Sequence, residues 1–322
     1  MPDCETRPDL AAIRQAAERI AGLVQRTPLM RSRSLDQMFS GELHFKCEHL
    51  QRVGAFKARG AANAVFSLSA EELGKGVATH SSGNHGAAVA LAAGTKDAQA
   101  WVVMPDDAPA AKKRAVESYG ANIVDCKPGL ANREAALQEL VDKKGVHVIH
   151  PYNDYRVIAG QGTVALEIIE QQEDIDLLMV PVGGGGLLSG SLLAIKELRP
   201  EIQVIGIEPE RADDARQSLD SGERVIIDSP DTIADGLRAS LGDKTFPIIA
   251  ELVDDIVTVS EDAIIEATRL VWERMKQLIE PSAAVPVAAL LERRIELKGR
   301  RAAVVFTGGN LDLDWLPWQR DF

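Results

Sequence analysis

One lysine in this chain stands in a setting suited to covalent chemistry. Lys57 lies in the segment Gly-Ala-Phe-Lys-Ala-Arg-Gly at residues 54–60, among small neighbours at the start of an expected helix. A partly buried lysine near a helix N-terminus has a depressed pKa, and its free amine can then form a Schiff base with an aldehyde. A lone lysine is usually a surface residue, so this interpretation depends on the motifs that accompany it.

A run of four glycines, Gly183–Gly186, supplies a candidate anion site. It follows the apolar segment 177–181 and precedes the segment 187–198, so it joins an expected strand to an expected helix. Backbone N–H groups in such a loop and the helix N-terminus behind it bind phosphate. A tight turn without a ligand is the alternative, but four consecutive glycines cost backbone entropy. The loop lacks the Gly-Lys-Ser/Thr of a Walker motif and the GxGxxG spacing of a dinucleotide site.

The bulk properties exclude several other classes of protein. The 322 residues suffice for one large or two medium domains. A net charge of -12 argues against nucleic-acid or anionic-membrane partners, which require a basic face. Cys4, Cys47 and Cys126 fit neither a CxxC pair nor a zinc spacing, so reduced thiols are expected. The polar N-terminus and the lack of a long apolar stretch predict a soluble, cytoplasmic protein.

Strand patterns and helix patterns alternate along most of the chain, which predicts an α/β fold with open, twisted, mostly parallel sheets flanked by helices. The expected strands are 43–47, 76–79, 100–104, 122–125, 146–149, 177–181, 204–208 and 302–306. The expected helices are 10–21, 56–67, 87–93, 110–119, 132–144, 164–173, 187–198, 262–276 and 283–291. We expect the helix 164–173 to start at Gly160-Gln-Gly-Thr163. A break at His150-Pro151 predicts a large domain from residues 1–52 plus 150–322 and a small mobile domain from residues 53–149.

Several motifs in this order resemble one known family. They are Phe56-Lys57 with Arg59-Gly60-Ala61, Ser81-Ser82-Gly83-Asn84-His85-Gly86, Ala159-Gly160-Gln161-Gly162-Thr163 and Gly183–Gly186. The chain is similar to the serine racemase and serine/threonine dehydratase family of fold-type II pyridoxal-phosphate (PLP) enzymes, which includes 3-hydroxyaspartate dehydratases. The resemblance covers nearly the whole chain. It implies a tryptophan synthase β-like fold, a cofactor in the cleft between two domains, and a homodimer.

The resemblance also assigns a cofactor site. Lys57 would hold the aldehyde covalently and act as a base on one face of the substrate. Phe56 would support the ring, Asn84 would hydrogen-bond the pyridoxal 3-oxygen, and Thr307 would face the pyridine nitrogen. The phosphate would be held by the glycine loop and the residue after it, Gly183, Gly184, Gly185, Gly186 and Leu187.

Thr307 bears on the type of reaction. A neutral hydroxyl cannot keep the pyridine protonated as a carboxylate would, so the ring is a weaker electron sink and a leaving group at Cβ departs quickly. Serine, threonine or 3-hydroxyaspartate would lose water, and the aminoacrylate-type product would hydrolyse to a 2-keto acid and ammonia. The alternative for Thr307 is a hydroxyl that caps the turn after a strand.

Ser82 concerns a second activity, serine racemisation. In the racemase branch a serine at this place acts as acid and base on the face opposite the lysine, and racemisation needs a base on each face of Cα. A serine that only caps the backbone is the alternative. The turn formed by Ser81, Ser82, Gly83 and Asn84, together with His85, would contact the substrate and receive its α-carboxylate.

Arg133 concerns the choice of substrate. It matches an arginine that recognises a second carboxylate in family members, and a guanidinium suits a bidentate carboxylate contact. This raises L-threo-3-hydroxyaspartate, which would give oxaloacetate and ammonia; a solvated helix arginine is the alternative. Ser240 matches another substrate-side serine of the racemase branch. Ala55 and Tyr152 differ from many members and could reshape the substrate pocket.

The segment 208–214 resembles the divalent-cation loop of the racemase branch. Glu208 and Asp214 would supply carboxylates and Ala212 a backbone carbonyl. Oxygen ligands point to Mg²⁺ or Ca²⁺, with Mn²⁺ as a further option. An acidic surface turn is the alternative reading of this segment.

Two other classes of protein stay open at this point. A nicotinamide oxidoreductase on a doubly wound fold would bind NADH and hold no PLP. A non-catalytic amino-acid sensor with the same fold would bind ligand and release no keto acid.

Overall fold

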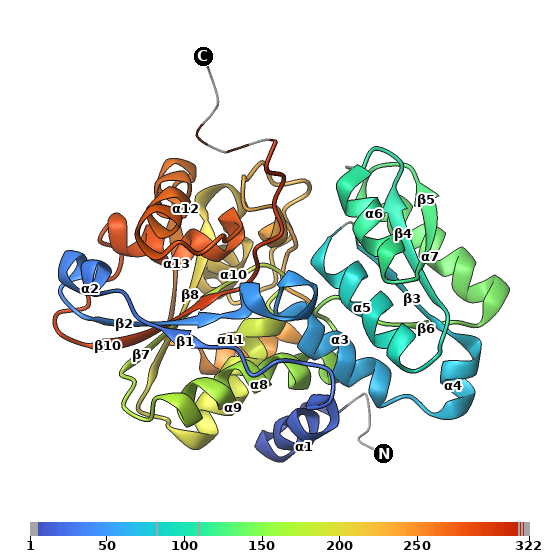
Figure 1. Cartoon of the computed structure of the whole chain (residues 1–322), viewed down its shortest axis with the longest axis horizontal. Coiled ribbons are helices and arrows are strands. Elements are labelled where there is room, and N and C mark those ends of the chain that lie inside the picture. The colour runs from blue at the N-terminus through green and yellow to red at the C-terminus, as the bar shows by residue number, and fades with distance from the viewer. Residues whose placement is uncertain (1–5, 82, 109, 315, 317, 319–322) are drawn as a thin grey trace.

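The chain forms two sheets that lie side by side, each covered by helices (Figure 1). The computed structural model describes residues 6–81, 83–108, 110–314, 316 and 318. The larger sheet has six strands in the order β1-β2-β10-β7-β8-β9, and only the β1–β2 pair is antiparallel. Its strands are β1 (Leu29–Met30), β2 (Glu42–Cys47), β7 (Leu177–Pro181), β8 (Gln203–Pro209), β9 (Asp255–Val259) and β10 (Arg301–Phe306).

The smaller sheet has four parallel strands in the order β5-β4-β3-β6. They are β3 (Val77–His80), β4 (Ala100–Pro105), β5 (Asn122–Cys126) and β6 (His147–Val148). Parallel strands covered on both faces are apolar throughout, because neither face meets water. The central strand β7, in which all five residues are buried, follows this rule.

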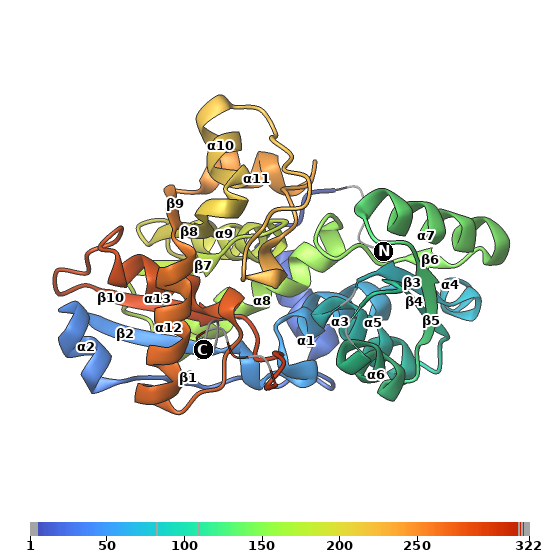
Figure 2. The ribbon, with the colours of Figure 1, turned by 90° about the horizontal axis from the view of Figure 1, so that it is seen from above.

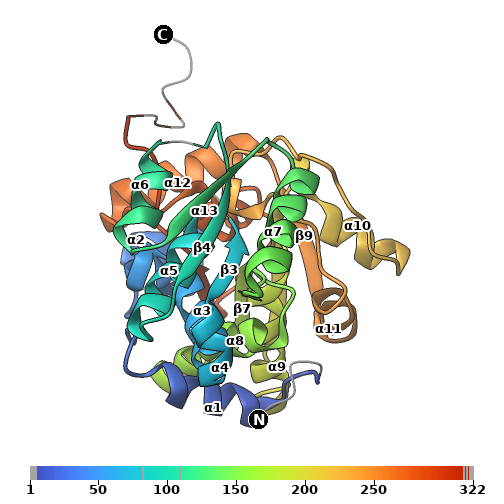
Figure 3. The same cartoon turned by 90° about the vertical axis from the view of Figure 1, so that its right-hand side faces the viewer.

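The helices cover both faces of each sheet, as the views from above and from the side show (Figures 2 and 3). On the larger sheet, α1, α8, α9 and α11 pack on one face, and α2, α12 and α13 pack on the other. On the smaller sheet, α3 and α5 lie on one face and α7 on the other. The helices are α1 (Leu10–Ile20), α2 (Arg33–Phe39), α3 (Lys57–Phe66), α4 (Ala70–Lys75), α5 (Asn84–Thr95), α6 (Ala110–Ser118), α7 (Leu130–Lys144), α8 (Tyr155–Gln171), α9 (Gly186–Leu198), α10 (Asp214–Ser221), α11 (Thr245–Leu252), α12 (Glu261–Met275) and α13 (Pro281–Leu291). The short 3-10 turns labelled within the described residues are η1 (Glu48–Leu50), η2 (Arg52–Gly54), η3 (Glu210–Ala212) and η4 (Asp235–Leu237).

The structure corrects the predicted start of one helix. α8 begins at Tyr155, where the side chain of Asp154 caps it by accepting a hydrogen bond from the Arg156 N–H. The residues 160–163, predicted as the helix start, lie buried inside α8 instead. Their glycines serve packing, because a Cβ on Gly160 would lie 2.7 Å from the Arg59 carbonyl oxygen of α3. A Cβ on Gly162 would lie 2.7 Å from a carbonyl oxygen of α9. α8 therefore contacts the backbones of both neighbouring helices.

A buried ionic network ties α3 to the larger sheet. The guanidinium of Arg59, fully buried, donates to both oxygens of Glu48 at 2.8 Å and to Glu167 of α8 at 2.8 and 2.9 Å. Lys46 of β2 donates to the same Glu167 at 2.6 Å. Each charge in this network has an opposite charge as a hydrogen-bond partner, which is what burial of a charge requires. The network fixes the helix that begins with Lys57.

Among the described helices, none combines the length and the apolar composition needed to cross a lipid bilayer.

Candidate active site

A cleft of about 1950 Å³ runs between the two sheets at the carboxyl ends of their strands. Its walls include Ser81 after β3, Gly183 after β7 and Thr307 after β10. Ligands of open α/β sheets bind outside the carboxyl ends of the strands. The predicted cofactor and substrate residues that line this cleft are Phe56, Lys57, Ser81, Gly83, Asn84, His85, Arg133, Gly183, Gly184, Gly185, Gly186, Leu187, Ser240 and Thr307.

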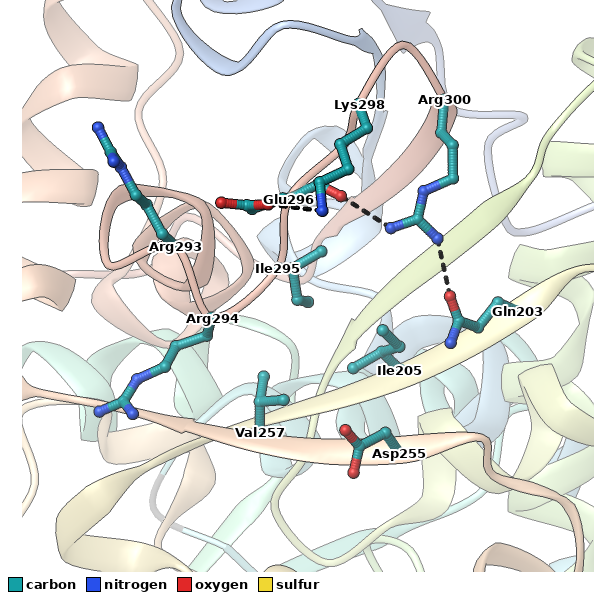
Figure 4. A pocket seen from close by; sticks show the side chains of 10 residues that line it. All are labelled: Gln203, Ile205, Asp255, Val257, Arg293, Arg294, Ile295, Glu296, Lys298 and Arg300. Carbon is teal, nitrogen blue, oxygen red and sulfur yellow. Dashed lines mark hydrogen bonds and ion pairs between the residues drawn. The ribbon is translucent and has the colours of Figure 1, made fainter.

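A smaller groove of about 590 Å³ lies at the opposite, amino ends of the strands (Figure 4). It is rimmed by basic side chains, but Lys298 pairs with Glu296 at 2.9 Å. Arg300 donates to the side chain of Gln203 at 2.9 Å. Both of these cations are already bound within the protein, and none of the predicted site residues that the structure describes lines this groove, so the larger cleft is the stronger candidate for an active site.

Lys57 is the first residue of α3 and reaches into the cleft. Its Nζ donates a hydrogen bond to the Pro151 carbonyl oxygen at 2.9 Å and lies 5.1 Å from the centre of the Phe56 ring. Burial lowers the pKa of the Lys57 amine to about 8, and the nearby Glu280 carboxylate opposes that effect. A lysine of this kind has a much larger reactive, neutral fraction at neutral pH than a surface lysine.

Three histidines surround the amine and stay neutral. Burial, and next the charge of Arg133, lowers the pKa of His80 to about 4. Burial, and next the neighbouring His80, lowers the pKa of His150 to about 4. Burial and the charge of Lys57 hold the pKa of His85 well below its usual value. The His85 Nε2 faces the Ile149 carbonyl oxygen at 3.1 Å. The site therefore surrounds Lys57 with polar rings that add no positive charge at neutral pH.

The glycine loop joins β7 to α9, as the sequence predicts. Gly185 has a φ of +83°, in the left-handed region that favours glycine. A Cβ on Gly184 would lie 2.3 Å from the ring of Tyr152, so no larger residue fits beside that ring. Within the described part of the chain, the N–H groups of Gly183, Gly184 and Gly185 have no hydrogen-bond partner. Unpaired N–H groups at a helix N-terminus are suited to a phosphate.

Phe56 and Thr307 are neighbours through the backbone, because the Phe56 N–H donates to the Thr307 carbonyl oxygen at 3.0 Å. Thr307 directly follows β10 and is only 4% exposed. The structure thus brings the residues predicted to contact the two sides of a pyridine ring to one end of the larger sheet.

Asn84 begins α5, and its side chain is held by residues that the sequence analysis did not identify. Its Nδ2 donates to both oxygens of Glu280, at 3.1 and 3.2 Å, and its Oδ1 accepts from Asn310 Nδ2 at 2.9 Å. Glu280 is the residue before α13, a helix predicted to start at residue 283. The Glu-Pro pair at 280–281 was the available signal, since proline favours the first position of a helix.

The turn after β3 places two of its predicted substrate residues on the cleft wall. The Ser81 Oγ accepts a hydrogen bond from the Gly83 N–H at 3.3 Å. Ser82, the predicted second base, lies outside the described residues.

Arg133 reaches the cleft from α7, on the side of the smaller sheet. Its Nε is buried and has no hydrogen-bond partner among the described residues. No carboxylate in the described part of the chain forms an ion pair with it. A buried guanidinium nitrogen left unpaired by the protein can be satisfied by a ligand.

The predicted cation residues lie beside the cleft. Glu208 is the second-last residue of β8 and Asp214 begins α10, and both are buried. Burial and the neighbouring Asp214 hold the pKa of Glu208 well above its usual value, and burial raises the pKa of Asp214 to about 7. Asp214 also accepts from the Leu241 N–H at 3.1 Å and hydrogen-bonds Ser240, whose Oγ accepts from Ile227 N–H at 3.1 Å.

This second site has few protein ligands. Ala212 is buried in η3, between the two carboxylates in sequence. Among the described residues, no group of three or more His, Cys, Asp or Glu side chains forms a metal cluster. Two carboxylates buried together without a cation are nevertheless an environment that a divalent ion would stabilise.

Comparisons with known proteins agree with this geometry. A family model described as "Pyridoxal-phosphate dependent enzyme" matches residues 20–308. A serine racemase of Dictyostelium discoideum is 46% identical over 94% of this chain and 95% of that protein. A beta-hydroxyaspartate dehydratase of Paracoccus denitrificans is 45% identical over 94% of this chain and 96% of that protein. The structure of maize serine racemase, 44% identical, superposes with a TM-score of 0.95 over 98% of this chain and 97% of that one. The chain belongs to the family of pyridoxal-phosphate dependent enzymes.

Proposed function

We propose that this enzyme dehydrates and deaminates β-hydroxy amino acids such as L-serine and L-threonine to 2-keto acids and ammonia. The observation that carries the proposal is that the Lys57 amine lines the same cleft as the glycine loop. Two relatives that match nearly the whole chain are named a serine racemase and a beta-hydroxyaspartate dehydratase.

The residues around the cleft fit PLP. The unpaired N–H groups of Gly183, Gly184 and Gly185 would hold its phosphate, together with those of Gly186 and Leu187. Phe56, Asn84 and Thr307 would contact the ring, and Lys57 would hold the aldehyde. When bound, PLP stabilises the negative charge that develops at the substrate Cα.

Lys57 would supply the base for the reaction. With a pKa of about 8, roughly one amine in ten is neutral at pH 7, against about one in 3,000 for an ordinary lysine. The Pro151 carbonyl oxygen orients the amine through its hydrogen bond. Because the neighbouring histidines are neutral, they do not repel the ammonium that forms when Lys57 takes a proton from Cα.

Thr307 favours elimination within this scheme. Its hydroxyl is neutral, so it would not keep a pyridine nitrogen protonated as a carboxylate would. Negative charge at Cα would then be relieved by loss of the β-hydroxyl instead of persisting. This argument separates dehydration from reactions that need a long-lived carbanion.

The test is a substrate panel with the purified PLP-loaded enzyme. L-serine, D-serine, L-threonine and the four stereoisomers of 3-hydroxyaspartate are each assayed for keto acid and ammonia, and the residual amino acid is checked for its enantiomers. We expect keto acid from at least one L-β-hydroxy amino acid and none with Lys57→Ala. PLP bound without any keto acid would contradict a dehydratase and favour an amino-acid sensor.

A second candidate substrate, L-threo-3-hydroxyaspartate, is favoured by one observation. Arg133 presents a guanidinium to the cleft whose Nε has no protein partner in the described residues. A second carboxylate on the substrate would satisfy it. The product would be oxaloacetate with ammonia, and the 45% identical hydroxyaspartate dehydratase supports this candidate.

Serine racemisation as a companion activity rests on Ser82. Lys57 can act on one face of Cα, and a serine on the other face would complete the pair of bases that racemisation needs. We expect Ser82→Ala to abolish D-serine formation while L-serine is still dehydrated. Equal loss of both reactions would argue against a base role specific to racemisation.

A divalent cation, Mg²⁺ or Ca²⁺, would bind Glu208, Asp214 and the Ala212 carbonyl, with water completing the shell. Support comes from two buried carboxylates: burial raises the pKa of both, and Asp214 raises that of Glu208 further. Because Asp214 bonds to the 240–241 segment at the cleft wall, the ion would act by ordering that segment. Treatment with EDTA should lower thermal stability, and Mg²⁺ or Ca²⁺ should restore it.

Three broader features belong to the same proposal. Residues 1–52 plus 150–322 and residues 53–149 would form two domains, and the smaller would close over substrate to exclude water. The enzyme would act as a homodimer in the cytoplasm. Support comes from the resemblance and from the reduced cysteines that the sequence predicts.

A further inference from the structure

We propose that Glu280 is a positioning residue that decides which side-chain atom of Asn84 faces the cofactor. The inference rests on the proposed PLP site, in which Asn84 donates to the 3-oxygen of the cofactor. No sequence motif pointed to Glu280, and its role emerges from hydrogen bonds that span the cleft.

Hydrogen bonds link three residues, Asn84, Glu280 and Asn310, to one another. Asn84 Nδ2 donates to Glu280 Oε1 at 3.1 Å and to Oε2 at 3.2 Å. The backbone N–H of Asn310 donates to Glu280 Oε2 at 3.1 Å. Asn310 Nδ2 donates to Asn84 Oδ1 at 2.9 Å, and also to the Val53 carbonyl oxygen at 2.7 Å. Asn84 belongs to α5 beside the smaller sheet, whereas Glu280 and Asn310 flank the larger sheet.

This arrangement fixes the amide of Asn84 in one of its two orientations. Donors face both oxygens of Glu280, as an ionised carboxylate requires, and such a group accepts hydrogen bonds but cannot donate them. The Asn84 nitrogen must therefore face Glu280, and its oxygen must face the Asn310 amide. In a flipped Asn84, its oxygen would face the Glu280 carboxylate, so two acceptors would meet. Its NH₂ group would face the Asn310 NH₂ group, so two donors would meet.

The orientation matters for the cofactor because an amide can offer either a donor or an acceptor. A donating N–H favours an ionised 3-oxygen, whereas a carbonyl oxygen favours a protonated one. Glu280 is 3% exposed, so water does not compete for its oxygens. Titratable groups near these residues include Lys57 of α3, which Glu280 affects electrostatically, His85, which follows Asn84 in α5, and Asp235 of η4.

Glu280→Gln is the decisive variant, because it preserves shape and changes only what the group can donate. The Asn310 N–H requires the amide oxygen at the Oε2 position. The new NH₂ group then takes the Oε1 position, 3.1 Å from Asn84 Nδ2, and two donors face each other. Asn84 Nδ2 then keeps only its 3.2 Å contact to the Oε2 position, which it shares with the Asn310 N–H, so its hold on this side and its donation to the cofactor are weakened.

The test measures the absorption spectrum of the PLP-loaded enzyme at fixed pH. The visible band reports an ionised 3-oxygen and the near-ultraviolet band a protonated one. We expect Glu280→Gln to lower the ratio of visible to near-ultraviolet absorbance about tenfold, as for losing one hydrogen bond to an ionised oxygen. In an Asn84→Ala background the same change should alter the ratio by less than about twofold, because the atom being positioned is absent.

Controls separate this role from charge and from folding. Glu210→Gln removes an exposed carboxylate that pairs with Arg294 and should leave the spectrum unchanged. Asn310→Ala alters no charge and removes one of the two contacts that orient Asn84, so it should shift the ratio in the same direction even if Glu280→Gln does not fold. Circular dichroism melting of each variant checks the fold.

Three outcomes would overturn the proposal. A larger visible band in Glu280→Gln would mean that the carboxylate acts only through its negative charge. An unchanged ratio would mean that Asn84 is oriented without it. An equal shift in the Asn84→Ala background would mean that Glu280 does not act through Asn84. A wild-type protein that shows no bound PLP would instead refute the proposed function, which keeps the two failures distinct.

Discussion

Replacing Lys57 by methionine should stabilise the cofactor-free protein at neutral pH, although it removes the reactive amine. Burial lowers the pKa of Lys57 from 10.5 to about 8, so the unfolded chain binds this proton more tightly than the folded protein does. Each pH unit between the two values is worth about 1.4 kcal/mol, and the folded state therefore carries a penalty of about 3 kcal/mol below pH 8. Methionine also loses the hydrogen bond to Pro151, worth about 1 kcal/mol, so the net gain is about 2 kcal/mol.

The pH dependence carries the sharper test. The penalty is fully present below about pH 8 and disappears as the pH rises toward 10.5, where the lysine of the unfolded chain also becomes neutral. The advantage of Lys57→Met should therefore shrink between pH 8 and pH 10.5 and reverse slightly above it. Urea unfolding of both cofactor-free proteins at pH 7 and pH 10 measures this difference.

A matched control is Lys75→Met, on an exposed lysine in the last turn of α4. It should change the free energy of unfolding by less than about 0.5 kcal/mol at either pH. If Lys57→Met is destabilised at pH 7, or if its difference from wild type is the same at both pH values, then the amine is not held in a site that disfavours its charge.

Three further substitutions test other parts of the site. Gly184→Ala places a Cβ 2.3 Å from the Tyr152 ring, so it should lower the free energy of unfolding in urea by about 1–3 kcal/mol and weaken PLP binding. Adding Tyr152→Ala to this variant should restore part of the lost stability. Arg133→Ala should lower kcat/KM for 3-hydroxyaspartate about 10–100-fold, but kcat/KM for serine by less than about threefold. Equal losses for the two substrates would exclude a contact between Arg133 and the second carboxylate. Arg59→Met leaves the buried Glu48 without its cation, while Glu167 keeps Lys46, and should cost about 3–5 kcal/mol in urea unfolding. A cost below about 1 kcal/mol would show that the network adds little.

The sequence was most informative where a motif lies between elements whose own patterns predict the same structure. The strand before Gly183 and the helix after it are both strongly apolar, so the strand bounds were predicted correctly and the helix begins only one residue earlier than predicted, at Gly186. The residues of that loop, with Lys57 and Asn84, converge on one cleft because each follows or begins an element at the carboxyl ends of the strands.

Elements that depend on tertiary contacts were missed. α2, α4, α10 and α11 have eight residues or fewer, and helices of this length are not stable alone, so their sequences carry little periodic signal. Gly160 and Gly162 resemble a helix start when read locally. Glycine is needed at both positions because the backbones of neighbouring helices leave no room for a side chain. Those contacts exist only in the folded protein.

Glu280 is a site residue that the sequence could not predict, for the same reason. It is separated by 196 positions from the asparagine that it holds, and no spacing rule connects the two. A glutamate is also a weak helix cap, so its place before α13 gave no reason to expect a function. Hydrogen bonds across a cleft are visible only once both walls are in place.

The direct backbone contacts of α8 have a mechanical consequence. α3 begins with Lys57, the proposed reactive amine, and α9 begins at the last residue of the glycine loop, the proposed phosphate site. Since α8 touches the main chains of both helices at its glycines, the span from amine to loop is set by rigid helices and not by side chains with alternative rotamers. A single methyl group at Gly160 or Gly162 would therefore act as a spacer that alters the length of cofactor the enzyme can accommodate.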